Sequence, residues 1–460
     1  MIVIKNIHKE ISTTDNICIK KTFWRYAIPS IIAMLVNGLY QVIDGVFVGH
    51  YVGFEGLAGI NVAWPIIGII IGLGLLVGMG SGSLISIYRG EMNDIKAQQA
   101  LFTGLALIII AGILAMFFAT TFTSNFLIAQ GATGLTFYTS SQYLEVFSKG
   151  AIFTIAASAL PMLIRNDDNP NFSTFLMLLG TIMNIVLDYL FIAHLDMGLR
   201  GAAIASIISQ FTITIIAVFY FFSSFSQLQL RWSDLKFNCH IALKTISLGA
   251  SSLFMYAYFS FIVAMHNKLF MEYGSSVHVG AFAIVGYLMT MYYLLAEGVA
   301  SGMQPPVSYY FGAGKTHKIK ATVLLATRVV VLTGIASIVF LNIFPHYLTG
   351  LFSSNDPTLA AETIKGIRLH LFAMFLDGVL ALSSVYFMSV NQGNKAIAIS
   401  IGNMIIQLPF LLLLPKWIGI DGIWLSVPLS NILLTIIVAP IVWNDIQRNQ
   451  DHNSQLSTEA

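Results

Sequence analysis

The sequence has few charged residues, because Lys, Arg, Asp and Glu together make up only 10% of its 460 residues. A soluble globular domain usually carries about 25%, so an ordinary cytosolic globule is excluded. The 23 basic and 21 acidic side chains nearly cancel, which argues against a nucleic-acid-binding surface. A disordered chain is excluded as well, since 57% of the residues are hydrophobic.

Cysteine is also scarce. Cys18 and Cys239 are the only two, and they form neither a CxxC pair nor a metal-ligand spacing. This excludes a disulfide-stapled secreted scaffold. Residues 1–25 are polar and lack the apolar core of a cleavable signal peptide. We therefore expect the first apolar span to remain as a membrane anchor.

Long apolar runs are what the sequence has in abundance. Each run can cross a hydrocarbon core about 30 Å thick as a helix, and none alternates as barrel strands do. Backbone polar groups in lipid must be satisfied within each segment, so the sequence predicts an all-α membrane protein with 12 transmembrane helices. The predicted spans are 26–50, 58–87, 98–121, 138–164, 172–194, 200–223, 242–267, 277–308, 319–345, 367–391, 396–415 and 421–444.

Basic residues in the predicted loops are concentrated on the side of the N-terminus. The positive-inside rule then puts both termini in the cytosol, in a multi-pass protein of the bacterial inner, or plasma, membrane. The opposite side collects only a few basic residues, which are Arg200, Lys268, Lys365, Arg368 and Lys416.

The chain looks like two copies of one six-helix unit. Asn166 precedes the fifth span and Asn391 the eleventh, while Gly-Leu-Arg-Gly at 198–201 and Gly-Ile-Asp-Gly at 419–422 precede the sixth and twelfth. Chance similarity between apolar helices is the alternative. Six is even, so both halves would have the same orientation, as pseudo-symmetric N- and C-lobe bundles around a central cleft. The expected parts are a cytosolic tail 1–25, an N-lobe 26–223, a cytosolic linker 224–243, a C-lobe 244–446 and a cytosolic tail 447–460.

Ionisable residues inside predicted spans are functional candidates by default. Asp44 lies in the first span, Asn184 and Asp188 share one face of the fifth at i, i+4 spacing, and Ser206 lies in the sixth. Asp44, Asn184 and Asp188 offer oxygen ligands for a hard cation such as Na⁺. The cluster can instead hold a proton, because burial and a neighbouring like charge favour a protonated carboxyl group. The alternative is that the aspartates cap broken helices or pair with lysines.

The second half differs from the first at the matching positions. His266 and Pro409 occupy the positions paired with the two aspartates, so we expect the coupling chemistry in the first half and interpret His266 as a packed histidine. Asp377 in the tenth span could neutralise a cationic substrate, form a second ion site, or be structural. Glu297 in the eighth span is a weaker candidate.

Proline and aromatic residues lie near the first-half acids. Pro29 removes a helical hydrogen bond, so it either starts the first helix or bends it when the aspartate of that span is protonated. Tyr40 and Tyr143 offer aromatic faces to organic cations, although Tyr143 could equally occupy an interfacial belt. The expected substrate cavity consists of Asn37, Tyr40, Gln41, Tyr143 and Asp377.

At these residues the sequence resembles the multidrug and toxic compound extrusion (MATE) family, in its DinF/MepA-like branch. The resemblance covers roughly 22–445 and includes the acidic first span, the Asn-x-x-x-Asp of the fifth and the loop Arg165-Asn-Asp-Asp-Asn-Pro170. Pro161 departs from it, since relatives with an N-lobe pocket would have an amide there. The residues that match the family's N-lobe cation site are Asp44, Asn184, Asp188 and Ser206; Pro29 matches its bending proline, and Tyr40 and Tyr143 its cavity aromatics.

The resemblance implies a monomeric antiporter rather than an enzyme. It would export organic, often cationic amphipathic drugs from a lipid bilayer by alternating access, with H⁺ or Na⁺ as the coupling ion and no resident cofactor. A lipid-linked oligosaccharide flippase is the alternative, but it would need a cationic cavity for pyrophosphate, for which Lys149 and Arg328 are the only candidates, and the deep charges are acidic. A membrane enzyme would need clustered HxxxH or DxxD patterns, and a channel a repeated filter-like loop.

Overall fold

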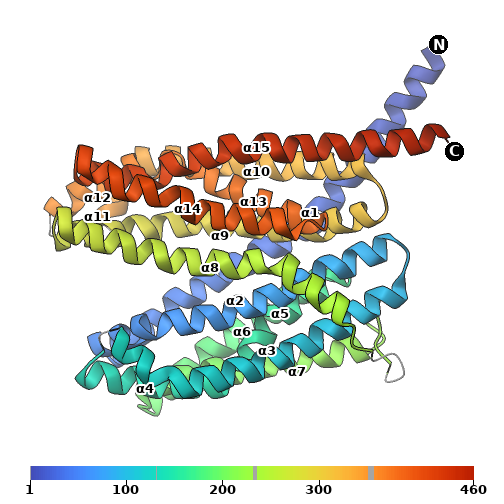
Figure 1. Ribbon diagram of the computed structural model, residues 1–460. Coiled ribbons are helices and arrows are strands. Elements are labelled where there is room, and N and C mark those ends of the chain that lie inside the picture. Colours follow the sequence, from blue (N-terminus) through green and yellow to red (C-terminus); the bar gives the residue numbers. More distant parts are fainter. Residues whose placement is uncertain (1, 131, 232–235, 351–356, 460) are drawn as a thin grey trace. The chain divides into compact units, whose positions relative to one another are not determined.

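The computed structural model describes the backbone of residues 2–130, 132–231, 236–350 and 357–459 (Figure 1). It describes side chains over the same ranges except 2–16, 41, 42, 54, 259, 260 and 449–459. Gln41, expected in the substrate cavity, therefore lies outside the described side chains. Across the described backbone all regular structure is helical, which confirms the predicted all-α class.

The helices follow the predicted spans closely. Within the described residues, ten helices are long and apolar enough to cross a membrane, and the number is 12 if each bent pair forms one span. The helical elements of the first half are α1 (Ile2–Tyr51), α2 (Phe54–Gly90), α3 (Asp94–Ala129), α4 (Gly134–Lys149), α5 (Ala151–Asn166), α6 (Pro170–Asp188), the π-helix η1 (Tyr189–His194) and α7 (Gly198–Phe222). Those of the second half are α8 (Cys239–Tyr273), α9 (Ser276–Gly312), α10 (Thr316–Ile343), α11 (Pro345–Gly350), α12 (Pro357–His370), α13 (Phe375–Ser389), α14 (Gly393–Ile418) and α15 (Ile420–Glu459).

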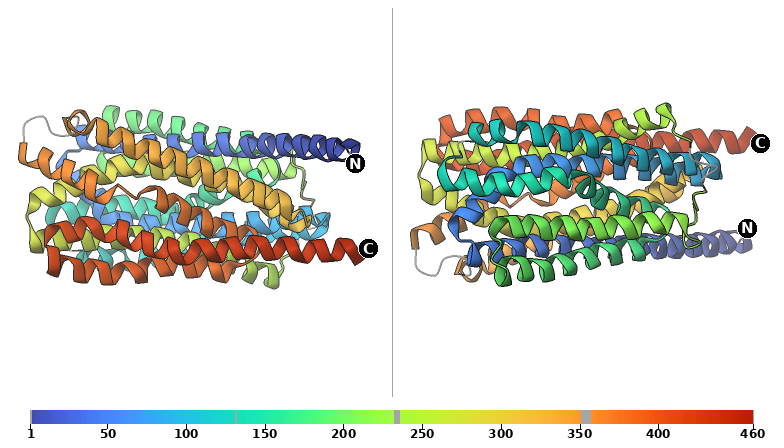
Figure 2. Two further views of the ribbon diagram at one scale, coloured as in Figure 1. Left: turned by 90° about the horizontal axis from the view of Figure 1, so that it is seen from above. Right: turned by 90° about the horizontal axis from the view of Figure 1, so that it is seen from below.

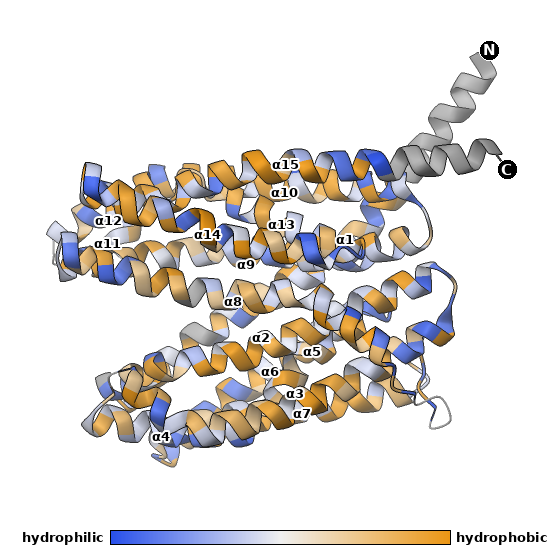
Figure 3. Ribbon diagram, in the orientation of Figure 1, coloured by the Kyte–Doolittle hydropathy of each residue, from blue (hydrophilic) through white to orange (hydrophobic). Residues whose placement is uncertain are grey.

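Hydrophobic residues recur along all the long helices (Figure 3). On α3, Ile109, Ile113 and Phe117 recur every four residues and are 51%, 52% and 60% exposed. A water-soluble protein rarely exposes so large an apolar surface. In lipid the same side chains meet hydrocarbon, so the exposed stripe fits a membrane-spanning helix.

Two of the predicted spans are bent. The fourth span is divided into α4 and α5, which meet at 60°, and the tenth into α12 and α13, which meet at 48°. Gly150 lies at the first bend, where a Cβ atom would overlap the side chain of Ile207 on α7. Both bends occur in the same span of each half, which agrees with an internal repeat.

Backbone conformation supports the repeat independently of side chains. Left-handed residues recur at loop positions about 222 residues apart, where helices end in tight turns. The matched pairs are Met92 (φ 57°) with Gly314 (67°), Asp168 (69°) with Asn391 (60°), and Gly198 (59°) with Gly419 (61°).

The chain packs into two compact units. One unit is residues 32–257, and the other combines residues 1–31 with 258–460. The divisions fall inside α1 and α8, so each of these helices belongs to both units. The boundary expected at 224–243 concerns the sequence repeat, whereas these units describe packing.

Glycines allow close helix packing inside each unit. In the unit that holds residues 258–460, a Cβ atom on Gly302 of α9 would overlap the backbone of Ala27 on α1. In the other unit, a Cβ atom on Gly249 of α8 would overlap the carbonyl group of Leu76 on α2. Small residues promote association of membrane helices because they let the backbones approach. In the unit that holds residues 258–460, α14 and α15 also lie side by side, as the two further views show (Figure 2).

Pro29 lies inside α1, two residues before the division between the units. The interpretation of Pro29 as a helix-start residue is therefore wrong. Proline inside a helix removes a backbone hydrogen bond and permits a kink. α1 is thus weakened next to the point where it passes from one unit to the other.

Candidate functional site

Four polar residues from three helices meet inside the unit that holds residues 32–257. Asn184 at the end of α6 donates from Nδ2 to the Ser206 hydroxyl oxygen on α7 at 3.3 Å. With its amide group turned over, its nitrogen donates to Asp188 Oδ2 at 3.2 Å and its oxygen accepts from the Ser206 backbone N–H at 3.2 Å. The turned amide satisfies both of its ends, so we prefer it. Asp44 on α1 completes the group, since it interacts electrostatically with Asp188.

The two carboxyl groups of this cluster are incompletely paired; Asp188 is buried and Asp44 is half-buried. Oδ1 of Asp44 and Oδ1 of Asp188 each lack a hydrogen-bond partner, and Asp188 is 0% exposed. Among the side chains that the structure describes, neither carboxyl group forms an ion pair with a basic residue. A buried charge is costly unless it is paired, so a small cation or a proton at the cluster would offset that cost.

The alternative explanation for the aspartates, helix capping, has little support. α1 continues as a helix on both sides of Asp44. Asp188 precedes η1, but its side chain forms no capping hydrogen bond. The π-helix itself was not expected from the sequence, which indicated one continuous span. Short π-helical segments are rare and occur frequently at functional sites.

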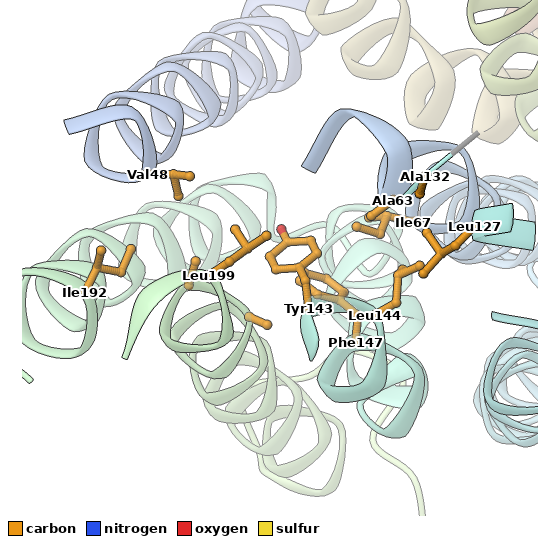
Figure 4. Close-up of a cluster of buried hydrophobic side chains, with 12 residues drawn as sticks. Val48, Ala63, Ile67, Leu127, Ala132, Tyr143, Leu144, Phe147, Ile192 and Leu199 are labelled. Carbon is orange, nitrogen blue, oxygen red and sulfur yellow. The ribbon is translucent and has the colours of Figure 1, made fainter. Parts of the chain in front are cut away.

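Aromatic side chains border the cluster. Tyr40 lies beside Ser206 and interacts electrostatically with both aspartates. Tyr143 on α4 is 4% exposed and lies 4.9 Å from Phe147 between ring centroids. Its hydroxyl oxygen points away from Phe147 (Figure 4). The ring belongs to a buried apolar cluster with residues of α1, α2 and α7, which does not fit an interfacial belt position.

The remaining expected residues are divided between the two compact units. Asn37 is half-buried and shares one face of α1 with Tyr40 and Asp44, at spacings of three and seven residues. Asp377 belongs to the other compact unit, where its carboxyl oxygen accepts a hydrogen bond from Asn431 Nδ2 at 2.5 Å.

Sequence reasoning missed a second polar contact in the same unit. The buried hydroxyl of Thr154 on α5 donates to Gln210 Oε1 on α7 at 2.6 Å. Gln210 lies one helical turn after Ser206 and therefore on the same face of α7. The sequence gave no indication of this contact, because the threonine and the glutamine are isolated polar residues in separate spans.

The site has mixed oxygen donors rather than a transition-metal pattern. Within the described part of the chain, no three His, Cys, Asp or Glu side chains come close enough to hold a metal ion. The donors are two carboxylates, one amide oxygen and hydroxyl groups. Hard cations prefer such oxygen ligands.

Comparisons with known proteins agree with this architecture. The MatE family model matches residues 29–190 and 250–413. The multidrug export protein MepA of Staphylococcus saprophyticus is 25% identical over 428 residues, which cover 92% of this chain and 93% of that protein. A structure of a MATE protein in complex with MaL6 covers 94% of this chain and 97% of its own at a TM-score of 0.89 and 21% identity. An outward-facing multidrug resistance MATE transporter of the MOP superfamily gives the same coverage and TM-score at 22% identity.

Proposed function

The chain belongs to the MatE family, whose model matches more than half of it, and from this premise we propose that it is a cation-coupled antiporter for organic compounds. Its cargo is organic and often cationic and amphipathic, and its coupling ion is H⁺ or Na⁺. It works as a monomer in the plasma membrane, with both termini in the cytosol. It exports compounds by alternating access and catalyses no covalent chemistry. The MepA relatives, named multidrug export proteins, support this cargo class.

The pair of unsatisfied carboxyl oxygens carries the proposal. Asp188 is buried and Asp44 is half-buried. The two side chains are close enough to interact, and each has one buried oxygen atom without a partner. A monovalent cation or a proton relieves their repulsion, and so does a cationic substrate group. Coupling ion and substrate therefore compete for the same negative charge, which is what an exchanger requires.

Binding changes the conformation only through differential affinity. A ligand shifts the balance between two states by as much as it prefers one of them. Asp44 lies on α1, and Pro29 weakens the same helix near its passage between the two units. We propose that ion binding at Asp44 and Asp188 changes the bend of α1 and so favours release of the substrate.

Neutralising Asp44 tests the proposal directly. Asp44→Asn keeps the size of the side chain but removes its charge, so drug efflux from everted vesicles should fall at least 10-fold while the amount of protein in the membrane stays the same. Asp196→Asn is the matched control, because Asp196 is exposed in the loop after η1. Wild-type efflux by Asp44→Asn would remove Asp44 from the mechanism.

The coupling ion is identified by a separate measurement. Efflux is recorded with Na⁺ replaced by K⁺ across a pH series. Loss of transport in K⁺ at every pH identifies Na⁺, whereas transport that follows the pH gradient in either salt identifies H⁺. Transport that ignores both gradients would contradict antiport.

Basic side chains give little support to the flippase alternative. A pyrophosphate-linked substrate calls for a cavity lined by cations. Lys149 is 66% exposed and pairs with Glu145 at 2.7 Å, and Arg328 is also exposed. Neither lies among the buried polar residues of the cluster.

A further inference from the structure

A polar pocket lies at one end of the unit that holds residues 32–257. It is bounded by the start of α3, by the chain that follows α7 and by the chain that precedes α8. Its volume is about 590 Å³, which is within the usual range for ligand pockets of roughly 300–1,000 Å³. The residues that line it are four glutamines, Arg231, Lys236 and Ile95.

The side chains of this pocket are positively charged or neutral. Arg231 and Lys236 contribute two positive charges, and no described lining residue is acidic. Between these two residues the sequence has Asp234, which would halve this charge but not cancel it. Glu91 and Asp94, near the start of α3, are exposed and do not line the pocket. The pocket therefore favours an anionic ligand.

The donors in the pocket are those that bind phosphate groups. Arg231 has a guanidinium group and Lys236 an ammonium group, and both form strong charge-assisted hydrogen bonds to phosphate oxygens. Each glutamine amide adds two N–H donors. Scattered basic residues at a membrane surface would follow from the positive-inside rule alone. That rule does not explain a hollow between them that is lined by amides.

Hydrogen bonds hold the walls of the pocket in place. Gln98 Nε2 on α3 donates to the Gln229 backbone oxygen at 3.2 Å. The Gln227 N–H donates to the buried carboxylate of Asp167 at 2.9 Å. The chain before α8 is attached to α3 by the Asn238 N–H, which donates to a threonine hydroxyl at 3.3 Å. Walls that are already ordered lose less conformational freedom when a ligand binds.

The pocket lies where the helices reach the end of their apolar spans. α3 begins at Asp94 and α7 ends at Phe222, within a few residues of the predicted span ends. Ile95 and Phe237 next to the basic residues are 71% and 43% exposed. A phospholipid has a phosphate group and an acyl chain in one molecule, so it can meet the basic and the apolar side chains together.

From this arrangement we propose that the pocket binds the phosphate headgroup of an anionic phospholipid. Arg231 and Lys236 contact the phosphate oxygens, the glutamine amides donate to the remaining oxygens, and Ile95 lies against the apolar part of the lipid. The positive-inside rule puts this end of the helices in the cytosol. Basic pockets between membrane helices on that side bind lipid headgroups.

A bound headgroup would connect parts of the chain that are far apart in sequence. Arg231 and Lys236 lie on the expected linker 224–243 between the two halves, whereas Ile95 lies on α3. The lipid would therefore tie the linker to α3 at the membrane surface.

Binding of a short-chain lipid to the purified full-length protein tests the proposal. The probe is dihexanoyl phosphatidylglycerol, kept below its micelle concentration and titrated calorimetrically into protein in neutral detergent. The double variant Arg231→Gln with Lys236→Gln should bind it at least about 10-fold more weakly than wild type, because both charged contacts are lost. The control Lys20→Gln with Lys21→Gln removes two exposed basic side chains of α1 and should bind like wild type.

Gln99→Leu tests whether the pocket, rather than surface charge alone, holds the headgroup. Gln99 lines the pocket on α3, and the substitution removes its amide without changing the charge. Lipid binding should weaken about 5-fold through the lost hydrogen bond to a charged group. Unchanged binding by Gln99→Leu would contradict a headgroup held inside the pocket.

Two soluble probes distinguish a lipid headgroup from a free phosphate. Inorganic phosphate and glycerol 3-phosphate carry the charge without acyl chains, so we expect neither to displace the lipid even in large excess. Displacement by glycerol 3-phosphate would assign the pocket to a soluble phosphate ester and overturn the lipid assignment.

The double variants provide the decisive comparison. Equal lipid affinity in wild type and in the Arg231–Lys236 variant would overturn the inference. So would an equal loss in the Lys20–Lys21 control, since binding would then follow surface charge alone. The site does not rest on the proposed antiport, because calorimetry involves no transport. Asp44→Asn should bind the lipid like wild type whether or not it still exports drugs.

Discussion

Asp167 holds together one end of the unit that contains residues 32–257, and replacing it by asparagine should destabilise the protein. Asp167 is 1% exposed and follows α5. Its carboxylate accepts four hydrogen bonds from the end of α7 and the chain that follows. The donors are the Tyr220 hydroxyl at 2.8 Å and the Ser226 hydroxyl, Gln227 N–H and Leu228 N–H at 2.9 Å each.

The loss can be worked out bond by bond. Tyr220, Ser226 and Gln227 all bond Oδ2, and Leu228 bonds Oδ1. An amide oxygen at the Oδ2 position keeps three bonds, but a neutral acceptor weakens each by about 1 kcal/mol. The amide NH₂ then faces the Leu228 N–H, and a buried unsatisfied donor costs about 1–3 kcal/mol. The expected destabilisation is about 4–6 kcal/mol.

Thermal unfolding in detergent, followed by intrinsic fluorescence, measures this effect. A destabilisation of this size is a large fraction of the usual total of about 5–15 kcal/mol, so the apparent Tm should fall by at least about 5 °C. Asp196→Asn carries the same charge change at an exposed position and should stay within about 0.5 kcal/mol of wild type. An Asp167→Asn protein that melts within 1 °C of wild type would refute the hydrogen-bond argument.

Two further variants test the site and the packing. Ser206→Ala removes the hydroxyl that contacts Asn184 and Tyr40, so efflux should fall about 10-fold. The control Ser209→Ala loses only a bond to its own helix and should export normally. Equal efflux by the two variants would exclude Ser206 from the site. Gly302→Ala forces a methyl group against the α1 backbone and should cost about 1–3 kcal/mol. Gly286→Ala on the same helix meets open space, and a Gly302→Ala protein that melts like Gly286→Ala would contradict the close packing.

Hydropathy was sufficient to locate the helices, because membrane spans are defined by length and apolar content. It did not show that the fourth and tenth spans are bent. The bend at Gly150 lies against Ile207, a residue of another helix, and a linear pattern carries no information about such a neighbour. The predicted spans are also shorter than the observed helices, since α8 begins at Cys239 and α9 continues to Gly312. Helices continue into water beyond the apolar core that hydropathy detects.

The candidate site could be predicted in part for a similar reason. Spacing of four residues places Asn184 and Asp188 on one helical face without any tertiary information. Asp44 and Ser206 were included because polar groups in apolar spans are costly, and the structure brings all four residues together. Thr154 and Gln210 were missed because both are uncharged, so neither is conspicuous in an apolar span. Whether these residues bind the coupling ion remains a prediction.

Each half also ties its helices together with a tyrosine–aspartate bond, but donor and acceptor are exchanged. In the first half Asp167 follows the fourth span and Tyr220 ends the sixth. In the second half Tyr386 lies in the tenth span and bonds Asp445 on the twelfth at 2.9 Å. The same two spans are joined in both cases. The repeated frame therefore specifies which helices meet, while the side chains that join them are free to differ.

The same freedom accounts for the difference between Asp44 and His266. Each carboxyl group buried without a partner carries a desolvation cost, and the first half already holds two of them. A matching acidic pair in the second half would double that cost and require a second neutralising ion. His266 avoids this cost, because its neutral ring is buried beside Phe270 and Phe282 with hydrogen-bond partners at both nitrogen atoms. A duplicated fold can thus keep an acidic group in one half and bury a neutral ring at the matching position of the other.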